Sequence, residues 1–170
     1  MRIAVIGAGA IGGILAVRLA LSGQTVTVIE QGVHLEAIRK NGLKLVQHDG
    51  AEEVAADIRA VATCADAGEQ DLVFLALKAY VIAFVAPQMP ALFHEETMVV
   101  STQNGLPWWY FQNFSGPHAG YRIKSADPDG TIERSIDARR LLGCVVYPAG
   151  DIVAPGVVRR LEGDRVPLGE

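Results

Sequence analysis

The sequence predicts an α/β fold, with a doubly wound and mostly parallel sheet that carries helices on both faces. Short runs rich in β-branched residues alternate with segments of helical periodicity along the first part of the chain, as successive strand–helix–strand units require. A glycine-rich turn directly follows the first of these runs. Half of the 170 residues are hydrophobic, which is enough for one sizeable core and predicts a single domain over residues 1–170.

The N-terminal segment is predicted to form a strand, a helix and a second strand. Residues 2–6 are a short apolar run that suits a strand covered on both faces in a parallel sheet. Apolar residues recur at helical spacing from Ile11 to Leu19, and Gly23 offers a flexible residue at which a helix can end. Residues 25–29 are again β-rich. Such a unit forms a right-handed parallel crossover.

The alternation continues through the middle of the chain. A helix is predicted over residues 34–40, because Asn41-Gly42 supplies residues that tolerate a positive φ where it would end. Residues 43–46 and 54–57 are predicted to pair as a small hairpin outside the main sheet. Two further buried strands and a helical connection between them are expected at 71–77, 97–101 and around 81–85.

The last third of the chain is less regular. Turn-forming residues at 115–117 and 127–130 predict a mobile loop. From Leu141 onward the pattern is β-rich but interrupted by Pro and Gly, which predicts short antiparallel strands that extend the sheet. Their expected positions are 144–147, 152–153, 156–158 and 166–168.

Charge and cysteine content narrow the class of function. The net charge is −4 and the fifteen Lys and Arg residues form no dense basic run, so neither a nucleic acid nor an anionic membrane is the expected partner. Cys64 and Cys144 lack metal-site spacing and are predicted to be two buried thiols. The apolar segments are too short to span a bilayer, and a strand that starts at Arg2 leaves no room for a signal peptide, which predicts a cytoplasmic protein.

The strongest chemical signal is the turn Gly7-Ala8-Gly9-Ala10-Ile11-Gly12 between the first strand and its helix. In a G-x-G-x-x-G turn the first glycine permits the tight turn, the second lets the backbone approach a pyrophosphate, and the third lets the helix pack on the sheet. The helix that begins near Ala10 would point free N–H groups at the diphosphate. The sequence therefore predicts a Rossmann-type dinucleotide-binding domain; the alternative is a glycine-rich turn without a ligand.

Glu30 ends the second strand about 18 residues after Gly12, where an acidic side chain can accept hydrogen bonds from both adenosine ribose hydroxyls. Its carboxylate would repel the 2′-phosphate of NADP. The neighbouring Gln31 carries no positive charge, so NAD is the predicted cofactor. Two alternatives remain open. Glu30 is an exposed glutamate at a strand end without a ligand, or the side chain of Arg39 or Lys40 reaches back toward Glu30 and weakens the preference for NAD.

Several further motifs make the chain resemble the ketopantoate reductases (2-dehydropantoate 2-reductases). The resemblance covers essentially the whole chain and implies the cofactor-binding half of such an enzyme. Family members continue into an all-helical second domain that this chain does not contain, and Pro155-Gly156 and Leu168-Gly169-Glu170 resemble the end of the first domain. The motifs, besides the glycine turn and its neighbour Gly13, are His34-Leu35-Glu36-Ala37-Ile38-Arg39, Asn41-Gly42-Leu43, Leu77-Lys78-Ala79-Tyr80 and Gln103-Asn104-Gly105.

The resemblance also implies roles for individual residues. Lys78 resembles a family lysine that lines the cofactor cleft and contacts ribose or phosphates; the alternative is a solvated lysine at a strand end. Asn104 resembles an asparagine that orients nicotinamide ribose and substrate; the alternative is an Asn-Gly turn selected for its backbone. The predicted cofactor-binding residues, with no metal ligand among them, are Gly7, Ala8, Gly9, Ala10, Ile11, Gly12, Glu30, Gln31, Leu77, Lys78, Asn104 and Gly105.

Two departures from the family pattern limit what the resemblance implies. NADP-binding members carry an arginine close to the position of Gln31, so NADP use is in doubt. The aromatic run Pro107-Trp108-Trp109-Tyr110-Phe111 is associated with relatives of uncertain substrate, so ketopantoate itself is unproven. These aromatic residues would wall the nicotinamide pocket, form a docking face for the second domain, or form a local core.

The implied reaction is hydride transfer between a nicotinamide and a 2-keto acid or 2-hydroxy acid, a small-molecule partner. The proton-donating lysine and a substrate-holding carboxylate belong to the absent domain, so the chain alone is expected to bind cofactor without turnover. The histidines at 34, 48, 94 and 118 are scattered singly and are left out of the site. Alternatives are a non-catalytic NAD-binding sensor or scaffold and another NAD-dependent hydroxyacid dehydrogenase; a homodimer is the candidate assembly.

Overall fold

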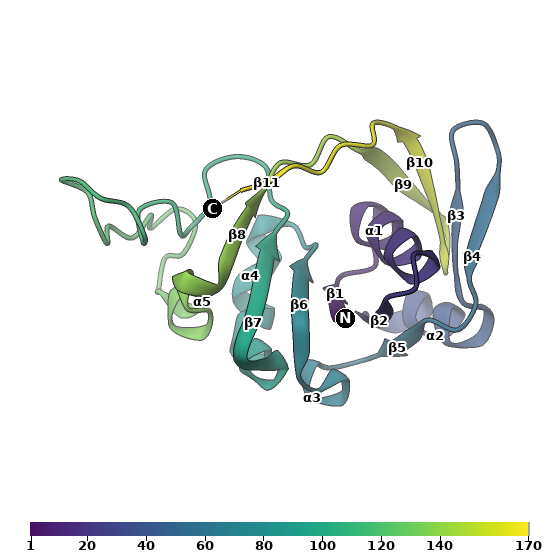
Figure 1. The fold of residues 1–170 in the computed structure, drawn as a ribbon, viewed down its shortest axis with the longest axis horizontal. Coiled ribbons are helices and arrows are strands. Elements are labelled where there is room, and N and C mark those ends of the chain that lie inside the picture. The colour runs from purple at the N-terminus through teal and green to yellow at the C-terminus, as the bar shows by residue number, and fades with distance from the viewer. Residues whose placement is uncertain (170) are drawn as a thin grey trace.

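Two β-sheets enclose one helix in this computed structural model, which describes residues 1–169. A seven-stranded sheet and a four-stranded sheet lie on opposite sides of helix α1 (Ala10–Leu21) (Figure 1). Glu170, the last residue of the motif that resembles the end of the family's first domain, lies outside the described residues. None of the helices within residues 1–169 is long and apolar enough to cross a membrane.

The seven-stranded sheet has the strand order β11-β8-β7-β6-β1-β2-β5. Its strands are β1 (Arg2–Ile6), β2 (Thr25–Ile29), β5 (Arg59–Val61), β6 (Gln70–Leu75), β7 (Phe93–Ser101), β8 (Leu141–Cys144) and β11 (Leu168–Gly169). All neighbours in it are parallel except β11, which is antiparallel to β8. The predicted α/β class with a mostly parallel, doubly wound sheet is confirmed.

The order of strands reverses between β1 and β6, because β2 and β5 follow on one side and β6, β7 and β8 on the other. Connections of both halves include helices: α2 (Gly32–Asn41), α3 (Cys64–Ala67), α4 (Ala79–Val85) and α5 (Thr131–Ser135), with 3₁₀ helices at Ala86–Leu92 and Ala138–Arg140. Such a reversal leaves a crevice at the carboxyl ends of the two central strands, the position at which open α/β sheets bind ligands.

The first strand–helix–strand unit follows its predicted local signals closely. Ile3 to Ile6 of β1 are all buried, as a central parallel strand requires. Helix α1 ends at Leu21, and Gly23 adopts a φ of +87° in the turn that follows. Helix α2 likewise ends at Asn41, directly before Gly42 with a φ of +74°. Both predicted helix stops are therefore confirmed.

The four-stranded sheet has the order β4-β3-β10-β9. It contains the predicted hairpin, which is antiparallel and lies outside the main sheet as expected. Its strands are β3 (Leu43–Val46) and β4 (Glu52–Ala55), and β4 begins two residues earlier than the predicted 54–57. It also contains β9 (Ala149–Ala154) and β10 (Val157–Glu162), and β10 runs parallel to β3. This sheet covers α1 on the face that the main sheet leaves free (Figure 1).

The placement of the late strands corrects the prediction that they extend the main sheet as antiparallel strands. Of these segments β11 does so, whereas β8 is parallel to β7, and β9 and β10 belong to the second sheet. The reason is packing: Val158 of β10 is fully buried and a Cβ at Gly13 of α1 would lie 2.7 Å from its Cγ1. The strand is held by contact with α1, which no local pattern reveals.

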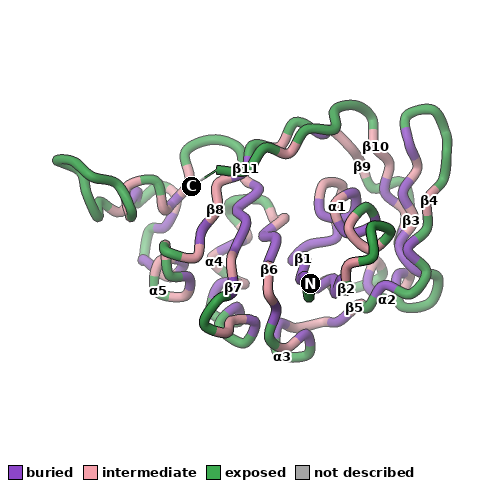
Figure 2. Tube along the Cα trace, in the orientation of Figure 1, coloured by how far each residue is buried: buried purple, intermediate pink, exposed green. Residues whose placement is uncertain are grey.

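The core has one apolar cluster on each face of the main sheet. One joins α1 and the second sheet, and the other joins α3, the 3₁₀ helix at Ala86–Leu92 and Trp108. Figure 2 shows the buried residues concentrated along the central strands and the exposed ones in the arm that projects from the side of β8. Cys64 and Cys144 are both free and buried, as predicted.

Candidate functional site

A cleft of about 780 Å³ opens where the strand order reverses, between the carboxyl ends of β1 and β6. Its volume lies within the usual range of ligand pockets. Of the predicted site residues, eight line it: Gly7, Gly9, Ala10, Ile11, Glu30, Leu77, Lys78 and Asn104. The other four, Ala8, Gly12, Gln31 and Gly105, are not among the lining residues.

The three glycines of the turn meet different surroundings. Gly7 has a φ of +88°, and a Cβ there would lie 2.9 Å from the Ala76 carbonyl oxygen. A Cβ at Gly12 would lie 1.8 Å from the Gly7 carbonyl oxygen. A Cβ at Gly9 would meet only Ile152 Cδ1, at 4.0 Å. Gly7 and Gly12 are therefore required by the fold, whereas the space beside Gly9 is open on the cleft side.

Helix α1 presents an uncapped N-terminus to this cleft. The N-cap residue is Gly9, which has no side chain to accept a hydrogen bond from the first turn. Within residues 1–169, the amides of Gly9, Ala10 and Ile11 donate to no acceptor. Such amides and the positive end of the helix dipole together attract an anion. The cleft therefore has donors for a phosphate group at the glycine turn.

Glu30 is fixed beside the turn by two backbone amides. Its Oε2 accepts a hydrogen bond from Ala8 N–H at 2.8 Å, and its Oε1 accepts one from Gln31 N–H at 2.9 Å. The side chain is half-buried and lines the cleft. Each carboxylate oxygen has a second lone pair to offer a ligand. The carboxylate is thus held at the end of β2, as the sequence predicts.

His34 is a residue that the sequence analysis left out of the site. Its Nε2 lies 2.8 Å from the Ala8 carbonyl oxygen, and Gly156 N–H donates to its Nδ1 at 2.9 Å. The first contact places it against the glycine turn. Two sequence signals point to it: His34 begins one of the family motifs, and it lies in the first turn of α2, just after β2. Its partner Gly156 is far along the chain and comes near only through the second sheet.

The segment after β7 closes one side of the cleft. Gln103 Nε2 donates to the carbonyl oxygens of Leu75 and Leu77, at 2.6 and 2.9 Å, and Gln103 Oε1 accepts from the Ser101 hydroxyl at 2.8 Å. These bonds tie the end of β7 to the end of β6. Gln103 was noted in the sequence as part of a family motif, but without this role.

Asn104 pairs with the backbone of Val146 as a peptide group would. Its Nδ2 donates to Val146 O at 3.0 Å, and its Oδ1 accepts from Val146 N–H at 2.9 Å. One N–H and one lone pair of the amide remain for a ligand. The Asn104 side chain therefore links two walls of the cleft. Its contact with substrate stays a prediction.

Lys78 precedes α4 as its N-cap and is exposed at the rim of the cleft. Within residues 1–169 its ammonium group forms no ion pair. Glu30 and Lys78 are the charged residues among those that line the cleft. The cleft thus offers a cation for an anionic group as well as the carboxylate.

The second sheet supplies the opposite wall, which the sequence analysis missed. Ala149, Gly150 and Ile152 of β9 line the cleft. A Cβ at Gly150 would lie 3.0 Å from Ile14 Cδ1 of α1 and 2.6 Å from the Arg159 carbonyl oxygen. The glycine therefore lets β9 lie directly on the first turns of α1, over the glycine turn.

The aromatic run after Asn104 does not form a wall of the cleft. Trp108 is 4% exposed and belongs to the core beneath the main sheet. Tyr110, Phe111, Phe114 and Tyr121 pack on one another, with ring centroids 4.9–6.5 Å apart. None of them is among the cleft-lining residues. Of the three alternatives, the nicotinamide-pocket wall is the one that the structure does not support.

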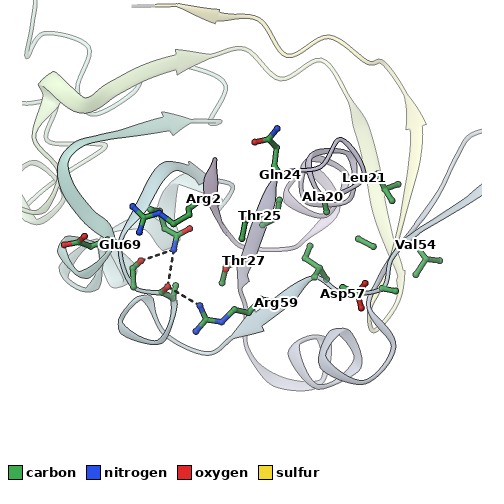
Figure 3. A pocket seen from close by; sticks show the side chains of 17 residues that line it. Arg2, Ala20, Leu21, Gln24, Thr25, Thr27, Val54, Asp57, Arg59 and Glu69 are labelled. Carbon is green, nitrogen blue, oxygen red and sulfur yellow. Dashed lines mark hydrogen bonds between the residues drawn. The ribbon is translucent and has the colours of Figure 1, made fainter.

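A second hollow of about 650 Å³ lies at the amino ends of β1, β2 and β5 (Figure 3). Its two arginines are already engaged: Arg2 pairs with Asp71 at 3.0 Å, and Arg59 donates to the carbonyl oxygens of Asp66 and Ala67. None of the predicted site residues lines it. The cleft at the carboxyl ends is therefore the candidate site.

The comparison with protein families decides the family. Residues 3–107 match the family described as ketopantoate reductase PanE/ApbA. The chain belongs to the ketopantoate reductase family. The predicted resemblance is thereby confirmed, and the matched residues contain the glycine turn, Glu30, Lys78 and Asn104.

Individual relatives agree with this assignment. The chain is 47% identical to a 2-dehydropantoate 2-reductase of Mesorhizobium japonicum, over 100% of this chain and 52% of the relative. A crystal structure from Ralstonia solanacearum, assigned to the ketopantoate reductases, shares 42% identity with a TM-score of 0.92 and covers 99% of this chain and 52% of that one. D-mandelate dehydrogenase with NADH and anilino(oxo)acetate shares the fold, at 22% identity and a TM-score of 0.77, over 99% of this chain and 48% of that one. The chain spans about half the length of the first two proteins.

Proposed function

We propose that this chain is the cofactor-binding part of a nicotinamide-dependent oxidoreductase of the ketopantoate reductase family. The observation that carries the proposal is the uncapped first turn of α1 in a cleft that also contains the fixed carboxylate of Glu30. Free amides suit a diphosphate, and a carboxylate at the end of the second strand suits ribose hydroxyls. The two groups together match the diphosphate and the ribose of an ADP moiety.

Six of the lining residues then have a role in binding. The amides of Gly9, Ala10 and Ile11 bind the diphosphate, and the open space beside Gly9 admits it. Glu30 accepts the hydroxyls of the adenosine ribose. Lys78 supplies a positive charge to phosphate or ribose, and the remaining N–H of Asn104 orients the nicotinamide ribose and the substrate. The bound nicotinamide supplies or accepts the hydride.

We further propose that Glu30 selects NAD over NADP. Its carboxylate is held by Ala8 N–H and Gln31 N–H and cannot swing away without losing both bonds. A negative charge of a 2′-phosphate about 4 Å away would cost on the order of 4 kcal/mol near a protein surface. NADP would bind only if this repulsion were relieved.

Isothermal titration calorimetry of the purified chain with NADH and with NADPH tests both the binding of a cofactor and the preference for NAD. The wild-type chain is expected to bind NADH more tightly, and Glu30→Arg combined with Gln31→Ser to shift the preference toward NADPH. Glu36→Arg is the matched control, because Glu36 carries the same charge on the exposed surface of α2 and pairs with Arg39 at 3.1 Å. Unchanged selectivity in the double variant would refute the ribose assignment, and no heat with either dinucleotide would refute the proposed function.

The reaction proposed for the whole protein is reduction of a 2-keto acid, or oxidation of the matching 2-hydroxy acid, with a helical second domain that supplies the proton donor. The 170-residue chain is then expected to bind NADH without oxidising it in the presence of 2-keto acids. Detectable NADH oxidation by the purified chain, with ketopantoate among the acids tried, would contradict the proposal that turnover needs the second domain. The homodimer stays a prediction, for which sedimentation is the test.

A further inference from the structure

The imidazole of His34 joins two parts of the cleft that are far apart in the chain. Nε2 lies 2.8 Å from the Ala8 carbonyl oxygen, and Nδ1 lies 2.9 Å from Gly156 N, 122 residues further on. Gly156 N–H can only donate, so Nδ1 must carry a lone pair. The proton of the neutral ring is then on Nε2, which donates to Ala8 O. The hydrogen-bond partners therefore assign one tautomer to this histidine.

One end of this bridge controls the glycine turn. Ala8 is held on both sides, because its N–H donates to Glu30 and its carbonyl accepts from His34. A trans peptide group is planar, so the direction of Ala8 C=O fixes the opposite direction of Gly9 N–H. Gly9 N–H is one of the free amides at the cleft. His34 thereby sets the direction of a donor without lining the cleft itself.

The other end controls the opposite wall. Gly156, with a φ of +75°, forms the turn between β9 and β10, and a Cβ there would lie 3.2 Å from Ala37 Cβ of α2. Strand β9 runs from this turn over the glycine loop, where Ile152 lies 4.0 Å from the position of a Cβ at Gly9. The bond to His34, together with the one that Lys44 N–H donates to the Gly156 carbonyl oxygen at 2.9 Å, holds the hairpin tip, from which β9 extends over the glycine turn.

We propose that His34 is a positioning residue of the dinucleotide site. In its Nε2–H form it holds the Ala8–Gly9 peptide and the β9–β10 hairpin in their mutual arrangement, so that the free amides and the wall facing them are in place before a ligand binds. This inference rests on the proposed function, because it assigns His34 to the same site. Preorganised donors bind more tightly, since less ordering is left to occur on binding.

Substitution of His34 tests the positioning role. His34→Phe keeps a ring of similar size and removes both hydrogen bonds, and we expect the dissociation constant for NADH to rise about tenfold. His34→Gln retains a donor and an acceptor on one side chain and is expected to recover part of that loss. His48→Phe is the matched control, because His48 lies exposed in the β3–β4 turn, outside the cleft. It should bind NADH as the wild type does.

Nitrogen NMR of the imidazoles gives a second readout that needs no ligand. His34 is expected to show the shifts of a neutral ring protonated at Nε2, and Gly156 N–H to be protected from hydrogen exchange. A ring protonated at Nδ1 would overturn the bridge whether or not dinucleotide binds, and this test applies even if His34→Phe does not fold.

The two proposals fail in different ways. If the wild-type chain binds NADH and a folded His34→Phe variant binds it equally well, the positioning role is refuted and the proposed function stands. If the wild-type chain binds neither NADH nor NADPH, the proposed function is refuted and the inference with it, although the measured tautomer would still describe the fold.

Discussion

Replacing Gly9 and Gly12 by alanine, one at a time, separates the part of the glycine turn that serves the fold from the part that serves the ligand. The added methyl group is the same in both variants and the positions lie one helical turn apart. At Gly12 the new Cβ would lie 1.8 Å from the Gly7 carbonyl oxygen and 2.9 Å from Ala76 Cβ. At Gly9 it would meet only Ile152 Cδ1, at 4.0 Å.

The structure sets the expected size of each effect. Gly12→Ala forces β1 and α1 apart, and overpacking of this kind costs about 3 kcal/mol at the upper end of its usual range. For a chain of this length that corresponds to a fall of roughly 6–12 °C in the unfolding midpoint. Gly9 has a φ of −64°, which alanine adopts freely, so Gly9→Ala is expected to leave stability unchanged or raise it by up to about 1 kcal/mol.

Ligand binding should change in the opposite order. Under the proposed function, Gly9→Ala puts a methyl group where the diphosphate would approach the backbone. We therefore expect NADH to bind at least about tenfold more weakly, a loss of about 1.4 kcal/mol. Differential scanning fluorimetry gives the unfolding midpoints and calorimetry the affinities. A Gly9→Ala variant that binds NADH like the wild type, or a Gly12→Ala variant that unfolds at the wild-type temperature, would refute the reasoning.

Two further predictions concern titratable groups. Hydrogen bonds from the Arg2 backbone and guanidinium hold the pKa of Asp71 at about 2, below its usual 3.8. The ionised Asp71 therefore stabilises the fold fully above about pH 4, and this stabilisation is lost as the pH falls toward 2. The urea midpoint of Asp71→Asn should thus fall less steeply between pH 4 and pH 2 than that of the wild type. Equal slopes for the two proteins would contradict this. Burial raises the pKa of the Cys64 thiol to about 11 and also raises that of Cys144. Neither thiol should react with a disulfide reagent at pH 8 until the chain unfolds, and rapid modification of the native protein would contradict this.

Local patterns predicted the first half of the fold well. The run at residues 2–6, the apolar spacing after Ile11 and the stops at Gly23 and Gly42 all depend on neighbours in the chain, and the structure places strands and helices there. Strand β5 was not predicted, because a run of three residues is too short to show a pattern. The pairing of β10 with β3 was not predictable either, since a parallel pair of distant strands leaves no local signature.

The residues of the candidate site likewise fall into those that local patterns predict and those that depend on the packing of distant segments. Gly7, Glu30, Lys78 and Asn104 each follow a predicted strand, so the rule that ligands bind at carboxyl ends places them together, and the structure does bring them to one cleft. The wall formed by β9 and the bridge through His34 depend on how the second sheet lies on α1. That packing comes from buried contacts such as that of Val158 with Gly13, which no local sequence pattern predicts.

The pairing of β10 with β3 also has a consequence for the order in which the protein can fold during its synthesis. Lys44 and its partner Val157 leave the ribosome roughly 6–23 s apart at ordinary rates of translation. Throughout that interval one edge of β3 has no neighbour, and the part of α1 that β9 and β10 later cover is exposed. The cleft is thus completed late, because Ala149, Gly150 and Ile152 form one of its walls, although its glycine turn is among the first residues made.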